Sequence, residues 1–418
     1  MTRAIRRDWP WWLAALAGTG LMSWVGLTGF AWSDYDNEVA PAMRTFAGGD
    51  VAGFLAQAPS YGGSLILRAP FAAVTAALGG GELAIFRALA IPCLLIVAWL
   101  GVVLVRRMRD GGRSAGACAL VLALCVVNPI TIRALDIGHP EELLGGALAV
   151  AAVLAAGSRR TFLAAVLLGL AIATKAWAVL AIGPVLLALP DRRLLALLVA
   201  GAVTAAVLAP LALFGTHEAL VASATTTGSV IFLPWQIWWF LGETGHIVIG
   251  GDGLPKPEGY RVPPQWLSPL THPLIAFTVV PLSLLWARVR GAAPRLRGEE
   301  LLLLLALLFL ARCVLDPWNS VYYALPCILA LLAWEALCRP DRPPVLALAL
   351  SALTWVTFEM APDWLTPDMQ SAFYLAWALP MVAFLVREAY APSAKRAVSA
   401  PARDAGAARP VVPPARAV

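Results

Sequence analysis

The sequence predicts an all-helical protein that crosses a membrane many times. Hydrophobic residues make up 60% of the 418 residues and charged residues 13%, and the mean hydropathy is +0.77. Soluble domains carry about 25% charged residues. The long apolar stretches lack the alternation of barrel strands, so only helices would satisfy their backbone groups in lipid. We therefore expect one transmembrane domain over residues 1–390, with no separate soluble domain.

About twelve apolar stretches are candidates for membrane-spanning helices. The first follows Arg3, Arg6 and Arg7. It is too long for a signal peptide and lacks a clear cleavage site, which predicts a retained span. Two stretches, 161–174 and 176–190, are short for a full crossing and are expected to be tilted, half-depth or broken helices. The predicted spans are 10–32, 84–105, 115–133, 141–157, 161–174, 176–190, 194–214, 273–287, 300–315, 319–338, 344–360 and 371–387.

Basic residues concentrate on one side of this topology. With the N-terminus inside, 23 of the 31 lysine and arginine residues fall in segments that would face the cytoplasm, as the positive-inside rule expects. Because these residues sit in short loops between apolar stretches, the net charge of +6 does not indicate nucleic-acid binding. The abundance of arginine and alanine is typical of a GC-rich bacterial genome. The predicted location is a bacterial cytoplasmic membrane, with both termini in the cytoplasm.

Two long segments, 33–83 and 215–272, would lie on the outer face. We expect the first to contain a short helix over 40–55, broken at Gly48 and Gly49, and a helix over 65–78 along the membrane surface. The second contains the sequence PWQIWWF at 234–240. Its tryptophans would form either an interfacial anchor or a lid over a lipid-chain groove. The tail, 391–418, lacks apolar periodicity and is predicted to be disordered and cytoplasmic.

Polar side chains gather where the predicted spans meet the outer face. Carboxylates follow the first span, and a histidine and two glutamates open the fourth. Charges so close to a span are costly unless they face water or a site. An enzyme at this face would need such a set, with a carboxylate base and cations for an anionic leaving group. The candidate residues are Asp34, Asp36, His139, Glu141, Glu142, Lys175 and Arg312.

Four motifs at these positions together resemble those of the GT-C-fold glycosyltransferases. The nearest is the polyprenol-phosphate-sugar-dependent family that includes actinobacterial mannosyltransferases (glycosyltransferase family 87). The acidic motif after the first span leads into a long outer loop with Tyr61 and Pro70. The other motifs are GHPEE at 138–142, GLAIATK at 169–175 and DPWNSVYY at 316–323, and the resemblance extends over residues 10–390. The chain departs from the family pattern at His139, where glutamine is usual, and at Val321, where histidine is common.

The resemblance implies a GT-C-like fold and transfer of a sugar to a lipid or glycan acceptor at the outer face. The donor would be a polyprenyl-phosphate sugar, such as one carrying mannose or arabinose, within the membrane lipid. The reaction would invert the anomeric carbon. Asp34 would be the general base, with Asp36 as the close alternative. General-base catalysis contributes about 10²–10⁴-fold to a rate.

The leaving polyprenyl phosphate is an anion, which cations would stabilise through charge-assisted hydrogen bonds. The candidates for that role are Arg312, Lys175, Arg133 and His139. The DxD sequence at 34–36 also fits a divalent-cation site, but donors with a single phosphate do not require a metal, so no cofactor is expected. The substrate- and phosphate-binding residues that the resemblance implies are His139, Glu141, Glu142, Lys175, Arg312 and Tyr322.

Each candidate residue also has a simpler possible role. The acids after the first span would be solvated or cap a helix. The histidine and glutamates before the fourth span would simply begin a helix, where the dipole favours carboxylates. Lys175 would reach up to the lipid headgroups, and Arg312 would pair with Asp316.

Two other functions compete with glycosyl transfer. A transporter or lipid-linked-sugar flippase would place polar groups at mid-membrane depth on several spans. The interiors of 10–32, 115–133, 194–214 and 344–360 hold few polar residues besides serine and threonine, which favours the enzyme. A non-catalytic membrane scaffold gives no reason for acids to converge on one face.

Overall fold

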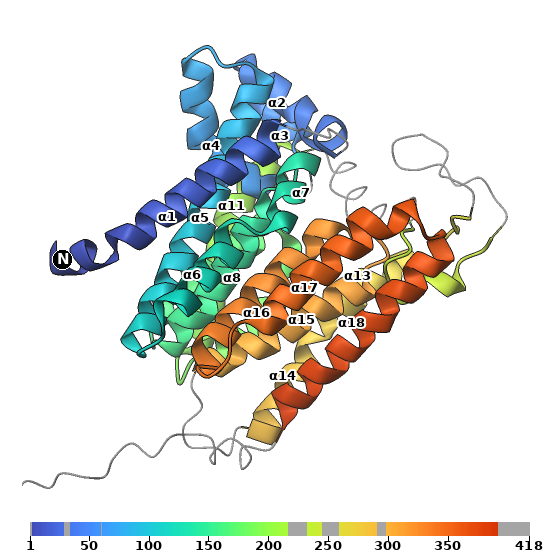
Figure 1. Cartoon of the computed structure of the whole chain (residues 1–418). Helices are drawn as coiled ribbons and strands as arrows, with labels where there is room; N and C mark the ends of the chain where they lie inside the picture. Colours follow the sequence, from blue (N-terminus) through green and yellow to red (C-terminus); the bar gives the residue numbers. More distant parts are fainter. Residues whose placement is uncertain are drawn as a thin grey trace, which may run out of the picture.

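The helices lie side by side in one elongated bundle, with a group of short helices packed on one end (Figure 1). The computed structural model describes residues 2–28, 34–59, 61–215, 232–244, 259–290 and 298–391. Within these residues, the only β-structure is an isolated antiparallel bridge between Glu243 and Val262. The prediction of an all-helical protein is therefore confirmed for the described part of the chain.

Most of the bundle consists of apolar helices joined by short connections, and several begin at a capping side chain. Asp50, Ser114, Asn128 and Thr366 each accept a hydrogen bond from a backbone N–H in the first turn of the helix that follows. The bundle helices are α1 (Thr2–Thr28), α5 (Glu82–Asp110), α6 (Ala115–Val126), α7 (Pro129–Ile137), α8 (Glu141–Gly157), α9 (Thr161–Thr174), α10 (Ile182–Ala188), α11 (Arg193–Phe214), α13 (Leu267–Phe277), α14 (Val279–Arg290), α15 (Leu301–Leu315), α16 (Leu325–Cys338), α17 (Val345–Trp355) and α18 (Pro367–Tyr390).

Shorter elements lie at the ends of these helices. A π-helical turn, η1 (Tyr35–Val39), leads into α2 (Ala40–Ala47), α3 (Val51–Gln57) and α4 (Gly62–Ala77). The 3₁₀ turn η2 (Ala176–Ala181) follows α9, and η5 (Val321–Ala324) precedes α16. A second π-helical turn, η6 (Val356–Met360), extends α17. Such turns often occur at functional sites, and η1 directly follows Asp34.

Seven stretches of helix in the described residues are long and apolar enough to cross a membrane, which indicates a membrane protein. Within the described residues, every apolar stretch predicted to span falls largely on a helix or on consecutive helices, and the end of the first stretch, 29–32, lies outside these residues. However, α8, α9 and α15 have 17, 14 and 15 residues, whereas a crossing takes about 20. The prediction of about twelve spans is therefore not confirmed. The seven stretches are Glu82–Asp110, Ala115–Ile137, Arg193–Phe214, Pro269–Arg290, Val321–Cys338, Val345–Asp363 and Pro367–Tyr390.

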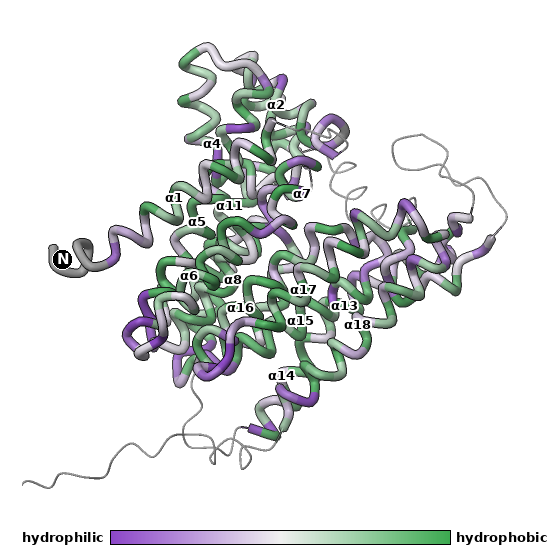
Figure 2. Tube along the Cα trace, in the orientation of Figure 1, coloured by the Kyte–Doolittle hydropathy of each residue, from purple (hydrophilic) through white to green (hydrophobic). Residues whose placement is uncertain are grey.

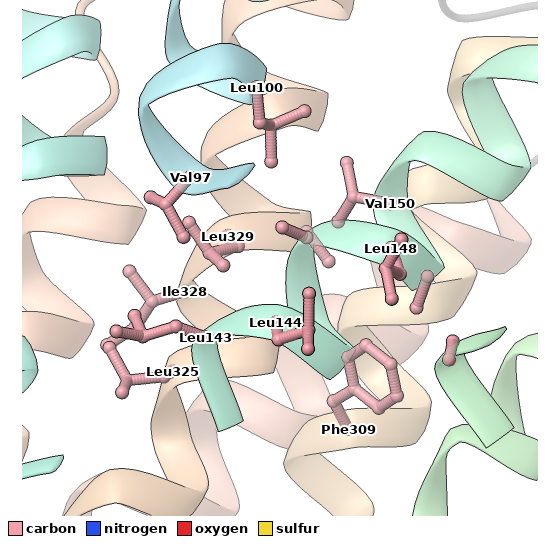
Figure 3. Close-up of a cluster of buried hydrophobic side chains, with 14 of the residues drawn as sticks. Val97, Leu100, Leu143, Leu144, Leu148, Val150, Phe309, Leu325, Ile328 and Leu329 are labelled. Atoms are coloured by element: carbon pink, nitrogen blue, oxygen red, sulfur yellow. The ribbon is translucent and has the colours of Figure 1, made fainter. Parts of the chain in front are cut away.

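The centre of the bundle is formed by α8, α15 and α16, whose residues are nearly all buried. A helix that is buried on all sides is apolar for that reason alone, so composition does not distinguish it from a span. Figure 3 shows Leu143 and Leu144 of α8 beside Leu325 of α16 and Phe309 of α15. These leucines directly follow the two glutamates that open α8. Their packing therefore fixes the first turn of that helix.

Two glycines let neighbouring elements approach α8 closely. A Cβ atom at Gly145 would lie 3.2 Å from the ring of Trp177 on η2, and one at Gly146 would lie 3.0 Å from Cα of Pro326 on α16. Small residues are common where helices pack in membrane proteins. As a result, η2 and α16 lie directly against the first turns of α8.

The arginine-rich loops meet at one end of the bundle. Arg107 on α5 donates a hydrogen bond to Ser158 after α8, and Arg113 donates to the carbonyls of Arg339 and Arg342 after α16. The starts of α5, α8 and α16 are therefore at the opposite end, together with the ends of α9 and α15. Figure 2 shows hydrophobic residues along the helices and hydrophilic residues concentrated towards the ends.

The helices predicted in the 33–83 segment are present. α2 ends at Ala47 and α3 begins at Val51, with Gly49 left-handed between them (φ 81°). α4 covers most of 65–78, and its position on a membrane surface stays a prediction. In the 215–272 segment, 216–231 and 245–258 lie outside the described residues, as does the predicted tail from 392 onwards. Trp238 donates to the Leu315 carbonyl at 2.8 Å, so this part of PWQIWWF packs on α15.

Candidate active site

An imidazole lies between two carboxylates at the end of the bundle opposite the arginine-rich loops. His139 Nε2 is 3.0 Å from Asp34 Oδ2, and His139 Nδ1 is 2.7 Å from Glu141 Oε1. The Tyr322 hydroxyl donates to the same oxygen of Asp34 at 3.2 Å, and its ring centroid is 4.5 Å from that of His139. Four parts of the chain thus each contribute one side chain to this cluster: the turn before η1, the α7–α8 connection, α8 and η5.

Two cations continue this network along α8. Lys175 Nζ is 3.1 Å from Glu141 Oε1 and 3.9 Å from Glu142 Oε1. Two guanidinium nitrogens of Arg312 each lie 3.3 Å from an oxygen of Glu142. Trp177 Nε1 also donates to Glu142, at 3.0 Å. When the histidine is protonated, the charges alternate in sign without a break from Asp34 to Arg312.

The contact between η1 and the α7–α8 connection depends on a glycine. Gly138 ends α7 with a left-handed backbone (φ 114°), which glycine adopts readily. A Cβ atom at this position would lie 3.0 Å from both the backbone nitrogen and the Cβ of Tyr35. The absence of a side chain therefore lets His139 approach Asp34. The Tyr35 hydroxyl, in turn, donates to Glu82 at the start of α5 at 3.2 Å.

The pKa of His139 is raised by its two carboxylate neighbours. Burial and the nearby Lys175 ammonium lower this pKa, because both disfavour a second positive charge. The charge of Glu141 and the hydrogen bonds to Asp34 and Glu141 outweigh them and raise the pKa of His139 to about 9. The raised pKa favours the imidazolium at neutral pH, and in that form both ring nitrogens donate.

Asp34 is the most exposed charged member of the network. Its side chain is 28% exposed, against 13% for Lys175 and less for the others. Burial raises the pKa of Asp34, but the hydrogen bonds and charge of its neighbours, His139 above all, lower it below its ordinary value. Within the described chain, both hydrogen bonds to Asp34 reach Oδ2. Among these residues, no hydrogen bond to Oδ1 is seen.

Aromatic rings pack against both cations of the network. Lys175 Nζ lies 3.8 Å from the ring centroid of Tyr61. The Arg312 guanidinium lies 4.0 Å from the ring centroid of Tyr323 and 4.7 Å from that of Trp177. Cation–π contacts of this kind contribute about 0.5–2 kcal/mol each. They exclude water from the cations and fix where the positive charge lies.

The structure brings together the predicted site residues with two exceptions, Asp36 and Arg133. That carboxylate is exposed on η1, and no hydrogen bond or ion pair to it is seen within the described residues. Arg133, the fourth candidate for phosphate stabilisation, instead pairs with Asp136 and with Glu359 on η6.

The simpler role suggested for Arg312 is not seen. Arg312 pairs with Glu142 rather than with Asp316. Asp316 instead accepts a hydrogen bond from the backbone nitrogen of Trp318, at 2.9 Å. Lys175 likewise turns towards the glutamates of α8, so it does not extend freely to headgroups.

Arg68 and Tyr61 contact the network but are not among the predicted site residues. Arg68 on α4 is buried, with a guanidinium nitrogen 3.7 Å from Glu141 Oε2. The Tyr61 hydroxyl donates to Glu38 at 2.6 Å, and its ring centroid is 5.4 Å from that of His139. The sequence does contain a signal for Arg68, which is the single arginine inside an apolar helical stretch. A charge in such a place needs a buried partner.

No group of three or more His, Cys, Asp and Glu side chains in the described residues is arranged to hold a metal ion. A scan against protein-family models and a search of curated proteins found no match to this chain. The function of the site is therefore inferred from its own chemistry.

Proposed function

We propose that this protein is a membrane glycosyltransferase that moves a sugar from a polyprenyl-phosphate donor to a lipid or glycan acceptor. The observation that carries the proposal is the state of Asp34. Its carboxylate is partly exposed, held at Oδ2 by His139 and Tyr322, and placed at the end of a buried series of alternating charges. A general base needs this combination of an ionised oxygen, a fixed orientation and access for the substrate.

In the proposed reaction, the acceptor hydroxyl donates a hydrogen bond to Oδ1 of Asp34. As the acceptor oxygen bonds to the anomeric carbon of the donor, the bond from that carbon to the phosphate oxygen breaks. The hydroxyl proton moves to Asp34, and the electron pair of the broken bond leaves with the polyprenyl phosphate. Attack from the face opposite the phosphate inverts the anomeric carbon.

Lys175 is the cation best placed to contact the leaving phosphate. An ammonium has three N–H donors, and the side chain is the most exposed cation of the network. An apolar groove of about 300 Å³ between α9, α10 and α11 supports a lipid donor. Its lining includes Leu168 and Ile172 of α9, and Ile172 is about one helical turn before Lys175. A lipid chain in this groove would bring its phosphate towards Lys175.

Transport is less well supported than transfer. The network lies at one end of the bundle, and α8 carries no charged residue after Glu142. On α15, no charged residue precedes Arg312. A pathway for charged groups across the membrane would need polar side chains along these central helices.

The proposal is tested with purified protein in lipid nanodiscs. The protein is given radiolabelled polyprenyl-phosphate mannose or arabinose, together with glycolipids extracted from bacterial envelopes as acceptors. We expect label to appear in an acceptor, with free polyprenyl phosphate released in equal amount. In a parallel assay with the protein in sealed lipid vesicles, label that crosses the membrane while still attached to its carrier, with no acceptor labelled, would instead identify a flippase.

A further inference from the structure

Cations surround the carboxylate of Glu141. Its Oε1 is 2.7 Å from His139 Nδ1 and 3.1 Å from Lys175 Nζ, and its Oε2 is 3.7 Å from a guanidinium nitrogen of Arg68. The side chain is 1% exposed. A carboxylate enclosed in this way is unsuited to the substrate-binding role that the family resemblance implies. Its contacts point to a role inside the protein.

The Arg68 guanidinium is itself held in place. It is fully buried on α4 and donates to the carbonyl and the hydroxyl of Ser64, at 2.9 and 3.0 Å, and to the carbonyl of Leu89 on α5, at 3.1 Å. A buried guanidinium stays charged and needs a nearby anion. Glu141 is the carboxylate that forms an ion pair with it among the described residues. The position of Glu141 is thereby tied to α4 and α5.

The position of His139 between two carboxylates favours a proton on both ring nitrogens. A neutral imidazole has one N–H and one lone pair. With carboxylates at 2.7 and 3.0 Å from its two nitrogens, a neutral ring would direct its lone pair at one of two negatively charged groups. An imidazolium donates to both. The geometry therefore favours the charged ring, in agreement with its raised pKa.

We propose that Glu141 is a positioning residue, clamped by Arg68 and Lys175, which holds His139 as an imidazolium with Nε2–H directed at Asp34. The importance of this arrangement for the reaction rests on the proposed function, because Glu141 acts on the acceptor only through His139 and Asp34. With Oδ2 of Asp34 engaged by a charged donor, Oδ1 is the oxygen left for the acceptor hydroxyl.

Several elements place charged or titratable groups against the imidazole. The carboxylates favour its protonated form, and the ammonium opposes it. Removal of the Glu141 charge would take away a carboxylate that favours the imidazolium and leave Lys175, which opposes it, so the imidazole should lose its proton more readily. The groups that face His139 are Asp34, Glu141, Lys175, Tyr61 and Tyr322.

The test is a titration of His139 by magic-angle-spinning NMR on [¹⁵N]histidine-labelled full-length protein in lipid bilayers. The chain has four histidines, and the spectrum of a His139→Gln variant assigns the signal. In the wild type, we expect both ring nitrogens to stay protonated at pH 7 and to titrate near pH 9. In Glu141→Gln, we expect the midpoint to fall by more than one pH unit, a loss of more than tenfold in proton affinity.

Glu82→Gln is the matched control. Glu82 accepts a hydrogen bond from Tyr35 beside the site but does not contact His139, so its substitution should leave the His139 titration unchanged. A midpoint that does not move in Glu141→Gln would overturn the proposal. If that variant does not fold, the wild-type titration decides alone, since a neutral His139 at pH 7 would also overturn it.

The two proposals fail separately. If His139 titrates as expected but no polyprenyl-phosphate sugar is transferred, the proposed function is wrong. The proposal that Glu141 holds His139 as an imidazolium is then still supported. Sugar transfer by a protein whose His139 is neutral at pH 7 would overturn the positioning role alone.

Discussion

Oδ2 of Asp34 lies 3.0 Å from Nε2 of His139, although the two residues are 105 positions apart in the sequence. This contact joins the exposed end of a charged network to its buried interior. Asp34 can meet a substrate, whereas His139, Glu141 and Glu142 are enclosed by helices. One partly exposed carboxylate is therefore held by side chains that are themselves buried.

Stability should fall as pH rises above neutrality. The pKa of His139 is about 9 in the folded protein and near 6.5 when unfolded. Because folding raises this pKa, its contribution is complete below pH 6.5 and is lost as pH rises to about 9. We expect the free energy of unfolding to fall by about 1.4 kcal/mol per pH unit over this range, or about 3 kcal/mol in all. The free energy of unfolding at each pH is measured by denaturant unfolding monitored by tryptophan fluorescence.

The same unfolding measurement on His139→Gln provides the control. Without a titrating side chain at position 139, the slope between pH 6.5 and pH 9 should largely disappear. An unchanged slope would assign the pH dependence to other groups.

The buried pair of Arg312 and Glu142 should stabilise the fold. Both side chains are almost fully buried, so Arg312→Met leaves the Glu142 carboxylate inside the protein with only the more distant Lys175, at 3.9 Å, as a cationic neighbour. We expect a loss of about 3–5 kcal/mol in the free energy of unfolding. The double variant Arg312→Met/Glu142→Gln removes both charges and should recover much of that loss. If the double variant is less stable than Arg312→Met alone, the two residues are not paired as described.

Gly138 should be intolerant of a side chain. Gly138→Ala would be strained by the positive φ of 114°, and its Cβ would approach the backbone of Tyr35 to 3.0 Å. A strained residue of this kind costs about 1–3 kcal/mol, and the displacement should also separate His139 from Asp34. Sugar transfer should therefore fall with stability.

Gly79→Ala is the matched control for this glycine. Gly79 also has a positive φ, 78°, but a Cβ atom added there would have no neighbouring atom within 4 Å. The substitution should lower stability through backbone strain and leave the rate of transfer unchanged. Equal loss of transfer in both variants would show that the contact with Tyr35 is irrelevant to the site.

The sequence was sufficient to predict the helices and the end of the bundle at which the polar residues meet. Apolar stretches and cap residues determine where helices run, and both are local features. The number of spans was less predictable, because α8 and α15 are apolar as central helices of the bundle. Hydropathy shows only that a residue avoids water, and an apolar residue is shielded from water equally well in the protein interior and in lipid.

The partners within the site could not be predicted from the sequence. Arg312 has Asp316 one turn away, but it pairs with Glu142, which is 170 positions distant. Such a choice depends on how α8 and α15 pack, which no local pattern contains. Arg68 belongs to no motif, although Ser64 one turn earlier offers the hydroxyl that it binds. The partners of buried charged residues therefore have to be identified from the tertiary structure.

The most direct test of the account compares Asp34→Asn with Asp36→Asn in a transfer assay using the purified protein and a polyprenyl-phosphate sugar. Both asparagines preserve shape, and only the first removes the charge that meets His139. We predict that Asp34→Asn still binds the lipid donor but loses transfer by at least about 10²-fold, while Asp36→Asn transfers sugar at close to the wild-type rate. Full activity in Asp34→Asn would contradict the account.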